Sequence, residues 1–88
     1  MSFETRSTIN YNILPEHDRD AMRLYIEHGI DPGGFLRSAL ENNLVEAFKR
    51  ANPINIAYMH NVADFLYNEA PMECWGSPDR VNYWLRKK

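Results

Sequence analysis

Prolines divide this chain into short segments, and most of them stand where a helix can begin. Proline is favoured at the first helical position, because the amide hydrogen that it lacks would have no partner there. Pro15, Pro32, Pro53 and Pro78 each open a segment with helical character. The last three follow residues that cap helices well, namely Asp31, Asn52 and Ser77. The spacing predicts four helix starts and a chain built from short helices.

In the first half of the chain, apolar residues recur at helical spacing. We expect a first helix from about Pro15 to His28, ended by Gly29 in the left-handed conformation, and a second that begins after Asp31. The first carries Ala21, Met22, Tyr25 and Ile26 on one face, and the second buries Phe35, Leu36, Ala39 and Leu40.

The second half contains three further segments of this kind. Asn43, with Glu46 three residues later, is a capping-box pattern and predicts a separate short helix. The next helix starts at Pro53 and stops before Pro71, since a residue that precedes proline avoids helical geometry. Its apolar residues are Ile56, Met59, Val62, Ala63, Phe65 and Leu66. A final amphipathic helix carries Val81, Trp84 and Leu85 after a Gly-Ser-Pro turn.

These segments predict an all-α fold, a compact bundle of four to five short helices. Residues 15–88 form one helical domain, because 88 residues leave no room for a second core. Within residues 1–14, the stretch "INYNI" alternates apolar and polar residues like a short strand, but a lone strand has nothing to pair with. We therefore expect residues 1–14 to form an extended or flexible arm. A chain this short buries only about 60–65% of its unfolded surface, so its stability is modest or shared with a partner subunit.

Composition excludes several classes of protein. The net charge of −2 argues against a general nucleic-acid-binding surface, which needs a strongly basic face. Cys74 is the only cysteine, so an intrachain disulfide is excluded. The first residues lack the layout of a signal peptide, and no apolar run approaches the roughly 18 residues that span a bilayer. We therefore expect a cytoplasmic protein without membrane contact.

The sequence also lacks the patterns that mark catalytic or metal sites. Its three histidines and Cys74 do not match the spacing of a zinc site. No serine stands in a nucleophile elbow, and Cys74, beside Trp75 in a turn, is expected to be a small packed thiol. We predict no catalytic residue, no metal, no cofactor and no enzymatic activity.

The glycine pair of "DPGGF" raises an alternative, because a helix start with glycines can hold an anion. Gly33 and Gly34 would form the cradle, with Arg37 one turn later. Arg23 and a stacking Tyr25 would complete a site for an anionic nucleotide or signalling molecule. A plain turn is the favoured interpretation, since Asp31 would repel a phosphate.

Aromatic residues gather in the last third of the chain, and tryptophan and tyrosine are common interface anchors. Trp75 precedes a turn, and Tyr83 points away from the apolar face of the last helix. With Tyr67 and the helix-terminal His28, these residues are our candidates for contact with a partner protein.

Two blocks of the chain carry a resemblance. "RLYIEHGIDPGGFLRSALENNLVEAFKRAN" and "FLYNEAPMECWGSPDRVNYWL" are similar to a widespread family of short, uncharacterised proteins that bacteriophages and prophages encode. The likeness covers about residues 14 to 85. It implies a bacterial host cell as the setting and binding as the mode of action, by analogy with small phage proteins that lack enzyme motifs.

Our leading hypothesis is a non-enzymatic accessory protein that binds and modulates a host or phage protein, including one that serves host defence, and that forms a homo-oligomer. The alternative is a sponge that sequesters a nucleotide. A small DNA-binding regulator ranks third, because no helix presents a run of basic and amide side chains to a major groove.

Overall fold

The computed structural model describes residues 9–88, which fold into helices and turns with no strand among them. The α-helices are α1 (Glu16–His28), α2 (Gly34–Leu40), α3 (Leu44–Arg50), α4 (Pro53–Ala57), α5 (Met59–Asn68) and α6 (Pro78–Lys87), and the 3-10 helices are η2 (Tyr11–Ile13) and η3 (Met72–Cys74). The predicted all-α fold is confirmed, although these residues form six α-helices instead of four or five. None of the described helices has the length and apolar character needed to cross a membrane.

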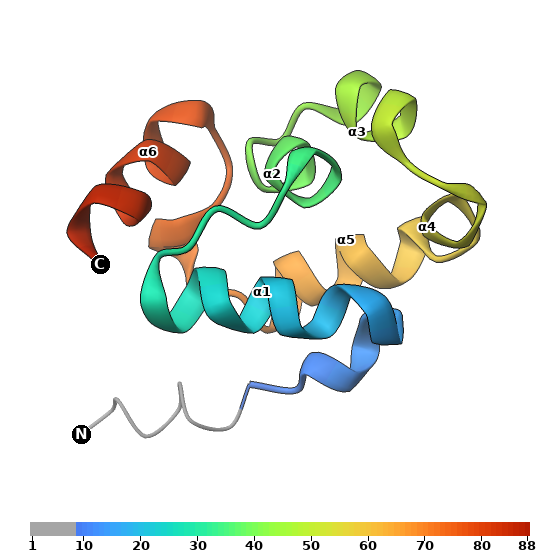
Figure 1. Ribbon diagram of the computed structural model, residues 1–88, viewed down its shortest axis with the longest axis horizontal. Coiled ribbons are helices and arrows are strands. Elements are labelled where there is room, and N and C mark those ends of the chain that lie inside the picture. Colours follow the sequence, from blue (N-terminus) through green and yellow to red (C-terminus); the bar gives the residue numbers. More distant parts are fainter. Residues whose placement is uncertain (1–8) are drawn as a thin grey trace.

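The helices pack in two groups around one apolar core. In Figure 1, α1 and α5 lie along the long direction of the molecule, with α6, α2 and α3 on one side and η2 on the other. The fully buried side chains come from both groups, and the largest are Tyr25, Phe65, Leu14, Met22, Leu40, Val62 and Val81. The stripe predicted for the first helix is therefore in the core, since Met22, Tyr25 and Ile26 are all buried.

Two buried aromatic residues join α1 to the C-terminal part of the chain. The Tyr25 hydroxyl donates a hydrogen bond to the Cys74 carbonyl at 2.7 Å. The Trp84 indole donates to the carbonyls of Tyr25 at 3.0 Å and Ile26 at 3.2 Å. Both polar groups are therefore satisfied inside the core, as buried tyrosine and tryptophan require.

Most of the predicted helix ends occur where the sequence placed them. Gly29 ends α1 with φ 68°, and the side chains of Asn43, Asn52 and Ser77 cap α3, α4 and α6. Gly29 has a second role, because a Cβ atom at this position would clash with the side chain of Lys88. A glycine is thus required there both by the backbone conformation and by the close approach of the end of α6.

The start of the second helix was predicted wrongly. Asp31 and Pro32 lie within the loop that follows α1, and α2 begins only at Gly34, after Gly33 with φ 95°. The Asp31 carboxylate accepts a hydrogen bond from the Gly33 amide at 3.0 Å and pairs with Arg37 at 2.7 Å. It therefore stabilises the loop instead of capping a helix, and the glycine supplies the conformation that delays the helix start.

The single helix predicted from Pro53 is in fact two helices, because Tyr58 interrupts it with φ −109° and ψ 20°. Val62, Phe65 and Leu66 of α5 are buried as expected. Ile56 and Ala63, assigned to the same stripe, are exposed. The break lets α4 and α5 turn different faces toward the core.

The predicted N-terminal arm differs from the structure over residues 9–14, while residues 1–8 lie outside the described part. Leu14 is buried, and the ring of Tyr11 packs on Phe65 with centroids 5.6 Å apart. The Asn61 side chain donates to the Ile13 carbonyl at 3.1 Å, and the Asn10 amide donates to Glu69 at 3.0 Å. This segment is therefore a packed turn and not an extended arm.

One carboxylate in the core has an unsatisfied oxygen. Asp18 is 6% exposed, and its Oδ2 has no hydrogen-bond partner among the described residues, while Oδ1 lies 3.4 Å from Nε2 of His17. Burial raises the pKa of the Asp18 carboxyl above its ordinary value, and the nearby His17 offsets this only in part. The folded state therefore holds this proton to a higher pH than the unfolded state does.

The close approach at Gly29 generates a first prediction. Gly29→Ala is expected to lower the free energy of unfolding by about 2–3 kcal/mol, from left-handed strain plus the clash with Lys88. In a Lys88→Gly background the cost should fall toward the strain of about 1–2 kcal/mol, because the side-chain atoms that clash are removed and only the Cα of residue 88 stays close. Urea unfolding of the wild type, the two single variants and the double variant measures both the strain and the cost of the clash. An equal cost in the two backgrounds would show that the contact with Lys88 contributes nothing.

Asp18 generates a second prediction, on pH. Because the pKa of the Asp18 carboxyl is raised in the folded state, the protonated group favours the fold at pH values below the ordinary pKa of 3.8. This contribution to stability is lost as the pH rises through the folded-state pKa. Asp18→Asn should therefore remove a part of the decline in stability between acidic and neutral pH. The control is Asp20→Asn, whose carboxylate is 88% exposed and should leave the profile unchanged. Thermal unfolding across that pH range gives the comparison.

Candidate functional site

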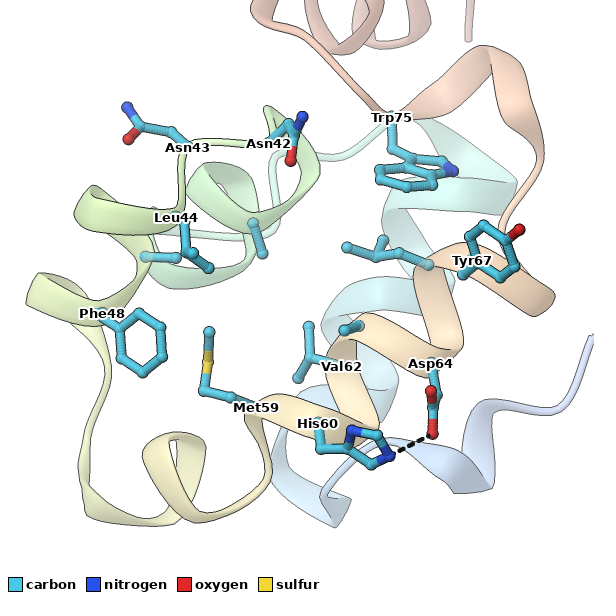
Figure 2. A pocket seen from close by; sticks show the side chains of 14 residues that line it. Asn42, Asn43, Leu44, Phe48, Met59, His60, Val62, Asp64, Tyr67 and Trp75 are labelled. Carbon is cyan, nitrogen blue, oxygen red and sulfur yellow. Dashed lines mark ion pairs between the residues drawn. The ribbon is translucent and has the colours of Figure 1, made fainter.

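An apolar groove of about 670 Å³ lies between α3 and α5. In Figure 2, Leu44 and Phe48 point into it from α3, and Met59 and Val62 face them from α5. Trp75 and Tyr67 lie on the side of the groove away from Phe48. The remaining lining residues are Ala39, Ala47, Ala63 and Leu66 together with the polar Asn42, Asn43, His60 and Asp64. The groove thus combines small alanine side chains with large apolar and aromatic ones.

The α3 wall is held to α2 by its backbone and caps. Asn42 ends α2 with φ 63°, a conformation that asparagine tolerates, and the amide of Asn43 donates to the Ser38 carbonyl at 2.9 Å. The Asn43 side chain then accepts from the Glu46 amide at 3.2 Å. Because Leu44 and Phe48 are four residues apart, they share the face of α3 that the groove exposes.

The Trp75 side of the groove is fixed by two backbone contacts. The carbonyl of Cys74 accepts the hydrogen bond from Tyr25, and the amide of Gly76 donates to the Leu40 carbonyl at 2.7 Å. Trp75 lies between these two anchored residues. Its ring is therefore presented at the groove by an anchored loop, which limits the conformational entropy that the loop itself would lose when a ligand binds.

Large apolar side chains around the groove remain in contact with solvent. Leu44 is 62% exposed, Phe48 44% and Tyr67 82%. Single exposed apolar residues are ordinary, but a contiguous group around a hollow marks an interaction site. Only Ala47 of α3 is buried, so this helix contributes more to the groove than to the core.

The charged side chains of the groove are few. Nε2 of His60 lies 3.2 Å from Oδ2 of Asp64 on the exposed side of α5. No serine, cysteine or lysine lines the groove in the part of the chain that the structure describes, and no three His, Cys, Asp or Glu residues there could hold a metal ion. The lining is suited to burying apolar surface with one polar contact at the rim.

The structure brings together two of the four residues predicted to contact a partner. Trp75 and Tyr67 line the groove, whereas Tyr83 borders a separate cleft between η3 and α6. His28 is exposed at the end of α1, outside both. Leu44, Phe48 and Met59 were not predicted as site residues. Their helical spacing is equally typical of a face that packs in the core and of a face that binds a partner.

The residues predicted for an anion site do not form one. Tyr25 is fully buried and its hydroxyl is bonded to Cys74, so its ring cannot stack on a ligand. Arg23 pairs with Asp20 on α1 at 3.4 Å. Gly33 presents its amide to Asp31, and Gly34 approaches the side chain of Arg50. These placements correct the prediction that the glycine pair, Arg23 and Tyr25 act together.

Arg37, the cation of that predicted site, is already neutralised. Its guanidinium contacts Asp31 at 2.7 Å, Glu41 at 3.0 Å and the side-chain oxygen of Asn82 at 2.7 Å. The hydrogen bonds that Arg37 donates to Glu41 and Asp31 raise the pKa of Arg37. The pKa of Asp31 is lowered, first by the hydrogen bond from the Gly33 amide and to a smaller extent by the one from Arg37. Arg37 therefore ties the loop and α2 to α6, a structural role.

No protein-family model, no curated protein and no solved structure matches this chain.

The saturated state of Arg37 generates a third prediction. Millimolar ATP or inorganic phosphate should leave the melting temperature of the protein unchanged, because a ligand raises it only by binding the folded state. Arg37→Met should lower the free energy of unfolding by about 1 kcal/mol, with or without these anions. Differential scanning fluorimetry provides both measurements. A rise in melting temperature that saturates with nucleotide concentration would restore the sponge hypothesis.

Proposed function

We propose that this chain is a non-enzymatic binding protein that binds and modulates a host or phage protein, with an apolar segment of that partner seated in the groove between α3 and α5. The observation that carries the proposal is the exposure of Leu44, Phe48 and Tyr67 around a hollow of about 670 Å³. Covering these side chains releases water from apolar surface, which is the main favourable contribution to protein association.

The composition of the groove supports a protein partner over a small polar ligand. Aromatic residues and methionine are enriched at the centres of protein interfaces and charged residues are depleted there. Trp75, Tyr67 and Met59 fit this pattern, while Asp64 and His60 supply a polar rim. The partner segment would bury apolar side chains against the alanine positions and the flanking rings.

The rigid presentation of Trp75 supports its role as an anchor. A few aromatic residues carry most of the binding free energy in many interfaces. The ring of Trp75 is partly buried, and its chain neighbours are fixed by hydrogen bonds to α1 and α2. A partner would therefore meet a surface that needs little rearrangement.

The resemblance to short proteins of phages and prophages bears on the identity of the partner. It supports a host or phage protein, including a component of host defence that would be inhibited when its apolar segment is occupied. Inhibition by occupying a surface needs no catalytic group on this chain.

A fourth prediction tests the groove with two adjacent positions of α3. Leu44 lines the groove, while Val45 is 72% exposed and does not line it. Leu44→Glu should weaken binding to the partner at least about tenfold, and Val45→Glu should leave it unchanged. Both changes place an acidic residue in the first turn of α3, which the helix dipole tolerates.

The measurement is affinity purification of the tagged protein and both variants from bacterial cells, with quantitative mass spectrometry of the captured proteins. Binding constants to the purified partner then confirm the difference. A partner captured equally by wild type and Leu44→Glu would place its site elsewhere, for example at Tyr83.

A further inference from the structure

Helix α6 presents a positively charged face to solvent, on the side away from its buried residues. Arg80, Tyr83 and Lys87 follow one another at helical spacing, which places them on one face, and Arg86 lies beside them. All four side chains are exposed, and we call these four residues the basic face of α6. In Figure 1, α6 lies at one end of the molecule and α4 near the other.

Positive charge is distributed unevenly along the chain. Residues 80–88 contain four of the ten basic residues and no Asp or Glu, so their side chains carry a charge of +4. Residues 1–79 contain the other six basic residues and all twelve acidic ones, and therefore carry −6. The positive charge is thus concentrated at the end of an otherwise acidic chain.

The cations of α6 also differ from most others in having no carboxylate partner. Among the residues that the structure describes, four cations outside α6 lie no more than 3.6 Å from a carboxylate oxygen, namely Arg23, Arg37, Lys49 and Arg50. Within the same residues, α6 forms no ion pair: Arg80 donates to two backbone carbonyls, and Lys87 lies over the Trp84 ring at 4.7 Å. The negative pole of the helix favours cations in its last turn, but Arg80 stands in the first. The charge of the basic face is therefore not neutralised within the chain.

The basic face borders a cleft that also offers apolar contact. Met72 is 75% exposed and Tyr83 is 52% exposed, and both line this cleft with Arg80, Glu73 and Asp79. Methionine, tyrosine and arginine are the residues that are enriched at protein interfaces. The cleft and the basic face together fit a segment that carries both carboxylates and apolar side chains.

We infer that the basic face of α6 binds an acidic segment of a partner protein, with an apolar side chain of that segment in the cleft beside Tyr83. Charge complementarity supports this partner, because hydrogen bonds between arginine and carboxylate are strong and clusters of arginine bind acidic motifs. The inference does not rest on the proposed function, since no residue of the basic face or of its cleft lines the groove.

Two other anionic partners fit this face less well. The phosphates of a nucleic acid would extend past the basic face toward a chain that carries −6, and Glu73 and Asp79 lie in the cleft itself. A base that stacks on Tyr83 would meet Lys87, whose Nζ lies 5.7 Å from the centroid of that ring. A membrane would have to receive the apolar face of α6, which is buried in the core.

The experiment is a titration of the isotope-labelled full chain, followed by NMR. The probe is a synthetic peptide of about 12 residues that repeats Glu-Glu-Asp-Leu, an acidic motif with apolar side chains. Salt is kept at about 50 mM, where exposed charges are weakly screened. We expect the amide signals of η3 and α6 to shift, with a dissociation constant below about 1 mM that rises with salt. A peptide that repeats Gln-Gln-Asn-Leu should shift none of them.

Two double variants with the same net charge separate the basic face from the charge of the whole protein. Arg86→Glu with Lys87→Glu should weaken binding of the acidic peptide at least about tenfold. Arg23→Glu with Lys49→Glu should leave the dissociation constant within about twofold of the wild-type value. Arg86→Gln with Lys87→Gln adds no negative charge to the end of the helix and should weaken binding as well.

Three results would overturn the inference. One is the absence of any shift in η3 and α6 when the acidic peptide is added at low salt. A second is an equal loss of binding in the two Glu double variants. The third is an oligothymidylate with the same number of charges that shifts the same signals at lower concentration than the peptide, which would assign the face to nucleic acid. Leu44→Glu should leave peptide binding unchanged, which separates this result from the test of the groove.

Discussion

The hydrogen bonds of Tyr25 and Trp84 hold the two groups of helices together. One residue of α1 donates to the loop before α6, and one residue of α6 donates to the last turn of α1. Both donors lie in the core, where competition from water is absent and a lost partner is costly. Gly29 then lets the end of α6 approach α1 closely. At these three positions α1 is joined to the C-terminal part of the chain.

The groove is a consequence of the same contact. Tyr25 fixes the carbonyl of Cys74, so the next residue, Trp75, has a defined place next to α2. The amide of Gly76 completes the attachment by bonding to Leu40, the last residue of α2. Since α3 follows α2 through the turn at Asn42, the position of α2 determines where α3 stands relative to α5. The core thus positions both walls of a cavity that it does not fill.

The sequence predicted most helix caps and several buried stripes, but it missed the orientation of α4, which depends on a distant residue. Gly29, Asn43 and Ser77 act within one helical turn, and their roles as caps could be read directly. The orientation of α4, which buries only Asn55, depends on His17, which bonds to Asn55 from 38 positions away. Tyr25 was placed on the apolar face of the first helix and, under the alternative hypothesis, at a ligand site, because a tyrosine in a helix can be buried or exposed. Packing buries it completely.

The helices α3 and α4 gain little from the core that they adjoin. Each buries a single residue, Ala47 in α3 and Asn55 in α4, while the larger apolar side chains of both face solvent. Local sequence and global fold usually agree, and where they disagree a second requirement has shaped the sequence. Exposed apolar residues occur elsewhere too, for example Tyr67 and Met72, but in these two adjacent helices they outnumber the buried residues. One face of α3 borders a hollow suited to a partner segment, and α4 carries two exposed isoleucines in a stretch, residues 51–63, without Asp, Glu, Lys or Arg. The core does not bury these side chains, so packing does not explain why they are apolar. The partner that we propose for the groove would explain it for Leu44 and Phe48.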